Sequence, residues 1–191
     1  PLSEEARDAL QCQIERLTTL TERLLGLSRG RYVDLQPTDL NASVHNALGL
    51  MGTELTHRHI ALALELASEL PLVNADTAQI ERALLNILIN AAEALEGCSD
   101  KHITVRTEVE DSDVVISVSD TGPGIPDDVQ KRLLEPFFTT KGAGTGLGLF
   151  SCQRIVEEEH GGTLEIDSRV GAGTTMRMRL AALAPNGSEV S

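Results

Sequence analysis

Apolar residues near the start of the chain recur at alternating spacings of four and three. Ser3 precedes them as an N-cap candidate, and Glu4 and Glu5 follow in the first turn, where acidic residues stabilise a helix. This pattern is typical of a coiled-coil or bundle seam, so we predict that residues 1–30 form one helix of a bundle. The seam positions are Leu10, Ile14, Leu17, Thr21 and Leu24.

Helical and strand patterns alternate along the rest of the chain. Apolar periodicity and capping residues predict helices over 39–54, 76–96, 127–134 and 146–160. Alternating apolar and polar residues predict strands over 32–40, 59–66, 103–110, 114–120, 163–169 and 174–181. We expect Pro37 at the exit of the first strand. In the second strand the alternation predicts one buried face, formed by Ile60, Leu62, Leu64 and Leu66.

The order of these elements predicts an α+β fold. Consecutive strands form antiparallel pairs with helices inserted between them, which favours a mixed sheet with helices stacked on one face. We therefore assign residues 31–183 to one α+β domain and residues 184–191 to a disordered tail.

Composition and charge narrow the function classes. Hydrophobic residues make up 41% of the 191 residues but aromatic residues only 2%, so the core must be aliphatic. The formal net charge of −13 argues against a nucleic-acid or anionic-membrane surface. No apolar run approaches the roughly 18 residues that a membrane span needs. Three widely separated cysteines fit neither a zinc site nor a disulfide framework, which favours the cytoplasm.

Two asparagines stand on one face of the long helix predicted over 76–96. Asn86 and Asn90 are four residues apart, in the apolar context "NILINAAEA". A buried amide without a partner costs about 1–3 kcal/mol, so each needs a hydrogen-bonding partner or a ligand. Neighbouring backbone could supply the partner. Alternatively, an amide oxygen could bind a hard cation such as Mg²⁺.

Two glycine-containing segments follow. In "DTGPGIPDD", Asp120 ends a predicted strand, and the segment is either a simple Asx turn or a carboxylate with room beside it for a flat base. In "KGAGTGLGLF", Lys141 precedes glycines that open a predicted helix, which is either a flexible surface loop or an anion site. Lys141 precedes the glycines, which does not fit a P-loop. Gly144, Gly146 and Gly148 have a spacing of two and no predicted strand before them, which does not fit a dinucleotide-binding turn.

Together, these motifs resemble the N, G1, F and G2 boxes of the sensor histidine kinases. This family belongs to the ATPase superfamily that includes gyrase B, heat-shock protein 90 and MutL. The matching residues are Asn90, Asp120-x-Gly-x-Gly, "FFTTK" and "GTGLGL", and "IVEEEHGGTLEIDSRVGAGTT" resembles the closing segment of the family. The resemblance covers nearly all of residues 3–180. It implies a two-layer α/β sandwich that binds ATP under a glycine-rich lid.

The resemblance also implies a role for each matching position. Asn90 would ligate Mg²⁺, Asp120 would read the adenine amino group, and Lys141 would face the phosphates. Phe137 and Phe138 would anchor the lid. Asn90 and Lys141 are therefore the expected catalytic residues. The expected ATP-binding residues are Asn86, Asn90, Asp120, Gly122, Gly124, Ile125, Lys141, Gly144, Thr145, Gly146, Leu147, Gly148, Leu149 and Thr174.

A histidine kinase also needs an acceptor histidine followed by an acidic residue. None of the five histidines fits, so we expect the acceptor on a helix before Pro1, or else a parent protein that lacks an acceptor. Residues 1–30 would then be the second helix of a dimerisation hairpin, and the parent protein would be a homodimer. The implied reaction transfers the γ-phosphoryl group of Mg-ATP to that histidine and then to an aspartate of a response regulator.

Two other function classes remain open. A gyrase- or chaperone-type ATPase carries a water-activating Glu one turn before the Mg²⁺ ligand, and here that position is Asn86. A regulatory nucleotide-binding module, either a degenerate kinase or an anti-sigma serine kinase, is the other alternative.

Glu93 stands where some relatives carry a phosphate-contacting Lys, and its role is open.

Overall fold

The computed structural model describes residues 33–141 and 144–184. The predicted bundle helix lies outside the described residues, as does nearly all of the predicted tail. The described residues are therefore those of the predicted α+β domain.

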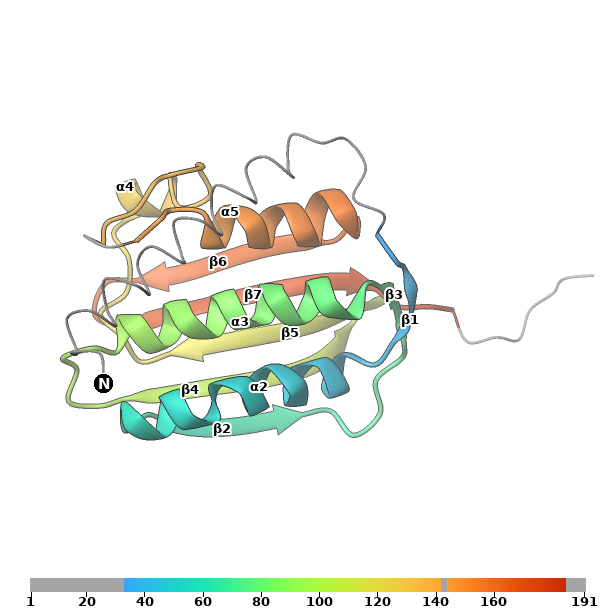
Figure 1. The fold of residues 1–191 in the computed structure, drawn as a ribbon, viewed down its shortest axis with the longest axis horizontal. Coiled ribbons are helices and arrows are strands. Elements are labelled where there is room, and N and C mark those ends of the chain that lie inside the picture. Colours follow the sequence, from blue (N-terminus) through green and yellow to red (C-terminus); the bar gives the residue numbers. More distant parts are fainter. Residues whose placement is uncertain (1–32, 142–143, 185–191) are drawn as a thin grey trace, which may run out of the picture.

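This domain has two layers, a five-stranded sheet and a layer of helices (Figure 1). The sheet has the order β2 (Ala61–Leu66), β4 (His102–Glu110), β5 (Asp113–Asp120), β7 (Gly173–Ala181) and β6 (Thr163–Arg169). β2 runs parallel to β4, and the other neighbouring strands of this sheet are antiparallel. The predicted mixed sheet of an α+β fold is therefore confirmed.

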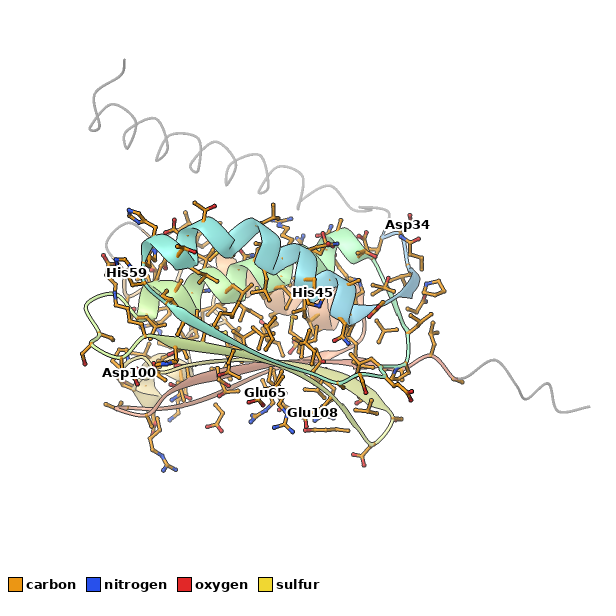
Figure 2. All side chains as sticks on the ribbon, turned by 90° about the horizontal axis from the view of Figure 1, so that it is seen from below. Asp34, His45, His59, Glu65, Asp100 and Glu108 are labelled. Carbon is orange, nitrogen blue, oxygen red and sulfur yellow. The ribbon has the colours of Figure 1, made fainter. Side chains whose placement is uncertain are left out.

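Three helical segments cover one face of the sheet. They are α2 (Leu40–His57), α3 (Thr77–Ala94) and α5 (Gly148–Gln153), which continues into the π-helix η1 (Arg154–Glu159). The opposite face carries charged side chains, and Figure 2 shows Glu65 and Glu108 projecting there. Arg106 pairs with both carboxylates. Helices on one face were also predicted.

The sequence of α3 explains why it occupies the centre of the helical layer. The Asp76 carboxylate caps its start by accepting the Gln79 N–H at 3.2 Å. Its apolar positions recur at intervals of three and four, and burying one Leu or Ile side chain contributes about 1.5–3 kcal/mol. The buried residues are Ile80, Ala83, Leu84, Ile87, Leu88, Ala91 and Ala92. Polar residues at 86, 90 and 93 are left on another face.

Two predicted strands differ from the structure. β1 (Gln36–Thr38) is shorter than predicted and pairs with a three-residue strand, β3 (Val73–Ala75), which was not predicted. Pro37 lies in the middle of β1 and not at its exit, and it is tolerated because β1 has a partner on one side only. The buried face predicted for this segment is only partly present: Ile60 is buried and Leu66 packs against the core, whereas Leu62 and Leu64 are 39% and 43% exposed, because β2 is an edge strand of its sheet.

Two predicted helices are shorter than expected. α4 (Asp127–Gln130) gives way to turns after one helical turn. The helix predicted from Gly146 begins two residues later, at Gly148, and its second half has π geometry. The predicted end is confirmed, because Gly161 has a positive φ of 65° and donates to the Glu157 carbonyl at 3.1 Å.

Candidate nucleotide site

One face of α3 forms the floor of the site. Asn86, Asn90 and Glu93 project from it into a pocket of about 430 Å³, and the other wall comes from residues between 138 and 149. Gly148 at the start of α5 lies so close that a Cβ built on it would be 4.0 Å from side-chain atoms of both asparagines. The predicted juxtaposition of the two asparagines with the glycine-rich segment is therefore present. The predicted residues that line this pocket are Asn86, Asn90, Lys141, Gly144, Thr145, Gly146, Gly148 and Leu149.

Lys141 reaches across the pocket to α3. Its ammonium donates to Asn90 Oδ1 at 3.4 Å and forms an ion pair with Glu93. Its backbone N–H donates to Thr139 Oγ1 at 3.1 Å, and its carbonyl accepts the Gly144 N–H at 3.2 Å. The two predicted catalytic residues, Asn90 and Lys141, are therefore in direct contact.

Asp120 lies at the end of β5, outside the lining of this pocket. Its Oδ1 accepts the Gly122 N–H at 2.8 Å, as the Asx-turn alternative requires. Burial raises the pKa of the Asp120 carboxyl, and hydrogen bonds from the backbone N–H groups of Gly122 and Thr174 offset part of that rise. A side chain at position 122 would collide with the carboxylate, because its Cβ would lie 2.7 Å from Oδ1. The absence of a side chain at Gly122 therefore leaves the space that the Asp120 carboxylate occupies.

Thr174 stands beside Asp120 because the two residues are register partners in β7 and β5. The Thr174 side chain is buried, and its Oγ1 lies 2.9 Å from Ser168 Oγ. The end of the sheet therefore brings a carboxylate and a hydroxyl together.

Ser168 and Gln130 hold the loop after Asp120, and neither was predicted as a site residue. Ser168 Oγ accepts the Ile125 N–H at 2.8 Å, and Gln130 Nε2 donates to the Ile125 and Ser168 carbonyls at 2.7 and 2.8 Å. Gly124 has a φ of +71°, and a Cβ there would lie 2.1 Å from the Arg169 carbonyl oxygen. The only available signal was that a loop of this kind needs hydrogen-bond partners from elsewhere in the chain.

The glycine-rich wall of the pocket, residues 144–149, contacts the segment "PFF" at 136–138. Phe137 donates its backbone N–H to the Gly146 carbonyl at 3.0 Å, and both residues have positive φ, 69° and 66°. Phe138 is half-buried under the Arg132 guanidinium, which lies 4.2 Å from the ring centroid. The Phe137 side chain is 53% exposed, and its backbone N–H joins the two segments. Leu147 lies outside the pocket lining, and its carbonyl accepts the Ser151 N–H of α5 at 2.8 Å.

α3 connects the two halves of the site. A Cβ built on Gly122 would lie 3.3 Å from the Ala94 Cβ, and Ala94 is one helical turn beyond Asn90. From Asn86 to Ala94 the axis of α3 advances about 12 Å. The pocket around Lys141 and the Asp120 turn therefore adjoin the same face of α3. Together they can bind an elongated ligand, with its anionic end at Lys141 and a flat polar end at Asp120.

The residues at the pocket fit a hard divalent cation. Asn90 supplies a half-buried amide oxygen and Glu93 a carboxylate, and Mg²⁺ binds through one or two such oxygens together with substrate phosphates. Across the part of the chain that the structure describes, no group of three or more His, Cys, Asp or Glu could hold a metal ion. Asn90 and Glu93 would therefore supply part of a cation's coordination, and water or a ligand would supply the rest.

Membrane-spanning helices were not expected. Among the described helices, none is long and apolar enough to cross a bilayer.

Comparison with known proteins supports the interpretation of these motifs. AtoS, a signal transduction histidine-protein kinase of Escherichia coli K12, is 36% identical over 190 residues, which are 99% of this chain and 31% of AtoS. The sensor histidine kinase ZraS of the same strain is 35% identical over 170 residues, which cover 88% of this chain and 36% of ZraS. The chain therefore spans about a third of the length of these relatives.

Solved histidine kinase structures have the same fold. The nucleotide-free catalytic domain of ThkA superposes with a TM-score of 0.69 at 30% identity, covering 78% of this chain and 96% of that domain. ShkA, solved at full length with AMPPNP, gives 0.76 at 27% identity, covering 97% of this chain and 41% of ShkA. ThkA in complex with the response regulator TrrA gives 0.75 at 25% identity over 94% of this chain and 51% of ThkA.

The family assignment rests on more than half of the chain. Residues 75–183, from the last residue of β3 to just beyond β7, match the family profile and include every predicted site residue. The chain belongs to the family of histidine kinase-, DNA gyrase B- and HSP90-like ATPases.

Proposed function

We propose that this chain is the ATP-binding catalytic part of a two-component sensor histidine kinase. In this proposal it transfers the γ-phosphoryl group of Mg-ATP to a histidine on a dimerisation helix, from which an aspartate of a response regulator receives it. The observation that carries the proposal is the line of Asn86, Asn90 and Ala94 along α3, with Lys141 over one end and the Asp120 turn against the other.

Each end of that line suits one part of ATP. The Asp120 carboxylate can accept a hydrogen bond from the adenine amino group, with the Thr174 hydroxyl beside it. Lys141 supplies positive charge for the phosphates, and Asn90 supplies an oxygen for Mg²⁺, with Glu93 next to it on the helix. Bound Mg²⁺ neutralises charge that develops on the phosphate oxygens. The backbone N–H groups of residues 144–149 are the other donors on the phosphate side.

The residues around Asn90 favour transfer to an acceptor over hydrolysis. A gyrase- or chaperone-type ATPase needs a water-activating carboxylate one helical turn before its Mg²⁺ ligand. In this chain that position is Asn86, an amide that cannot act as a base. The other carboxylate that lines the pocket from α3, Glu93, follows Asn90 and does not occupy the position one turn before it. Phosphoryl transfer requires positioning and charge neutralisation more than covalent help from the protein, and these residues can supply both.

The same proposal covers the partners and the compartment. Residues 1–30 would form the second helix of the dimerisation hairpin and join two copies of the parent protein, which would act in the cytoplasm. ThkA, whose catalytic domain shares this fold, has been solved with a response regulator, and this supports a response regulator as partner. The same fold in ShkA has been solved with AMPPNP, which supports ATP as the ligand.

Incubation with γ-labelled ATP and Mg²⁺ tests the transfer step. The chain alone should remain unlabelled, because none of its five histidines is followed by an acidic residue. Adding the dimerisation hairpin of the parent protein should yield label on the hairpin that is acid-labile and alkali-stable. Label on this chain, or release of inorganic phosphate without labelled hairpin, would contradict the proposal and favour self-modification or an ATPase.

A further inference from the structure

The contact between Lys141 and Glu93 joins two segments far apart in the sequence. Both side chains line the pocket, and the carboxylate of Glu93 holds the ammonium beside Asn90 Oδ1, 3.4 Å away. Lys141 is fixed at its backbone by Thr139 and Gly144, so its side chain crosses the pocket from a defined anchor. The cation that these two oxygen-bearing side chains hold in the structure is therefore the ammonium group of Lys141.

A metal ion and this ammonium need the same oxygens. If Asn90 Oδ1 coordinates Mg²⁺, the metal and the Lys141 ammonium would lie at the same oxygen, and two cations so close together repel each other. Glu93 is one turn along α3 from Asn90, so its carboxylate can face either cation. The Lys141 side chain is 43% exposed and that of Glu93 37%, so their pairing is weak enough to exchange.

We propose that Glu93 and Lys141 form a cation-exchange latch, an inference that rests on the proposed Mg-nucleotide site. In the nucleotide-free chain, Glu93 holds the Lys141 ammonium at Asn90. With Mg-nucleotide bound, Asn90 and Glu93 would face the metal, and the Lys141 ammonium would be released from both side chains. Glu93 is a positioning residue in this scheme, because it acts on Lys141 and on the metal shell and does not touch the reacting atoms.

The latch makes Mg²⁺ dependence the quantity to measure. For each variant, calorimetry gives the ratio of ADP affinity with Mg²⁺ to ADP affinity with EDTA. Lys141→Met removes the competing cation and should raise this ratio about two- to five-fold, the factor that an exposed ion pair supplies. Glu93→Gln removes a carboxylate from the metal shell and should lower it by a similar factor. In the Glu93→Gln background, adding Lys141→Met should change the ratio by less than in the parent, because no carboxylate holds the lysine.

The matched control is Lys131→Met. Lys131 is exposed just after α4 and does not line the pocket, so this change removes one positive charge without touching the latch and should leave the ratio as in the parent. Thermal unfolding without nucleotide checks that the variants are folded.

Three results would overturn the latch. The first is an equal ratio in the parent and both single variants, which would indicate a static surface ion pair. The second is a Lys141→Met change that alters the affinity ratio equally in the parent and in the Glu93→Gln background. The third is a rise in the ratio for Lys131→Met as large as the rise for Lys141→Met. In each of these three outcomes ADP still binds. If the proposed function itself is wrong, ADP should bind neither to the parent nor to any variant.

Discussion

Asp120 shows how one residue acquires its place from the elements around it. It is the last residue of β5, Gly122 leaves space for its carboxylate, and Thr174 reaches it through the register with β7. Its raised pKa has a physical cause in burial, only partly offset by two backbone hydrogen bonds. A half-buried carboxylate of this kind is suited to accept a hydrogen bond from a ligand.

Asp120→Asn should greatly weaken adenine nucleotide binding. The amide can turn its oxygen to the adenine amino group but loses the charge, and hydrogen bonds to a charged acceptor are worth about 1.5–3 kcal/mol. We therefore expect affinity for ADP to fall about ten- to a hundred-fold in calorimetry. Asp113→Asn, at the far end of the same strand, is the matched control. Equal affinity of Asp120→Asn and the parent would remove Asp120 from the adenine site.

The raised pKa of Asp120 also gives a pH dependence. A protonated carboxyl loses the charge that favours the ligand, so ADP affinity should fall as pH decreases through this pKa, at a higher pH than for a solvated aspartate. The free energy of unfolding without nucleotide should change in the opposite direction. Because the pKa of Asp120 is raised in the folded chain, the folded chain binds this proton more tightly than the unfolded chain, and the fold gains stability as pH decreases through this pKa. Titrations between about pH 4 and 7 should therefore differ in slope between the parent and Asp120→Asn. Parallel slopes would show that the affinity does not depend on this carboxyl.

Among the elements, α3 was predicted almost completely and the glycine-rich wall only in outline. The cap at Asp76, the apolar periodicity and the stop at Gly97 are all local signals, and they determine α3. The wall depends on contacts between segments, such as the Phe137–Gly146 hydrogen bond, which sequence patterns do not reveal. β3 has only three residues and pairs with a distant strand, so it lacked a pattern long enough to recognise.

Two glycines of the wall should respond differently to alanine. At Gly146, φ is +66° and a Cβ would lie 2.4 Å from the Phe137 carbonyl carbon, so Gly146→Ala should lower the free energy of unfolding by about 1–3 kcal/mol. Gly148 begins α5 and has space for a Cβ, so Gly148→Ala should be neutral or stabilising by up to about 1 kcal/mol. Urea unfolding of both variants measures the difference. Equal changes would mean that the turn at Gly146 is not required for the fold.

His160 connects the end of η1 with the start of α3. Its Nε2 accepts the Asp76 N–H at 3.0 Å, so Nδ1 carries the proton and donates to the Ile155 carbonyl at 2.6 Å. Removing the ring takes the acceptor from the Asp76 N–H and a donor from the Ile155 carbonyl, and His160→Ala should therefore lower the free energy of unfolding by about 1–3 kcal/mol. His45 is exposed on α2, as Figure 2 shows, and His45→Ala should change it by less than about 0.5 kcal/mol. Similar effects of the two substitutions would exclude the His160 connection.

For the whole molecule, the layers of the fold were predicted better than the contacts that hold the site in place. Local periodicity and the order of the elements predicted helices on one face of a mixed sheet, and the resemblance to the histidine kinases implied that Asn90 and Lys141 share one site. Ser168 and Gln130 were missed because their hydrogen bonds join β6 to the Ile125 loop and to α4, across 43 and 38 residues of sequence. The exposure of β2 was missed because a strand's position at the sheet edge depends on the complete topology.

Calorimetric titration of the full chain with ADP, with Mg²⁺ and with EDTA, tests most directly whether α3 carries a Mg-nucleotide site. We predict that ADP binds at one site, that Mg²⁺ strengthens binding, and that Asn90→Ala removes this Mg²⁺-dependent gain while the EDTA affinity changes little. Absence of ADP binding, or an Asn90→Ala variant that responds to Mg²⁺ as the parent does, would contradict the assignment of the metal and phosphates to this face of α3.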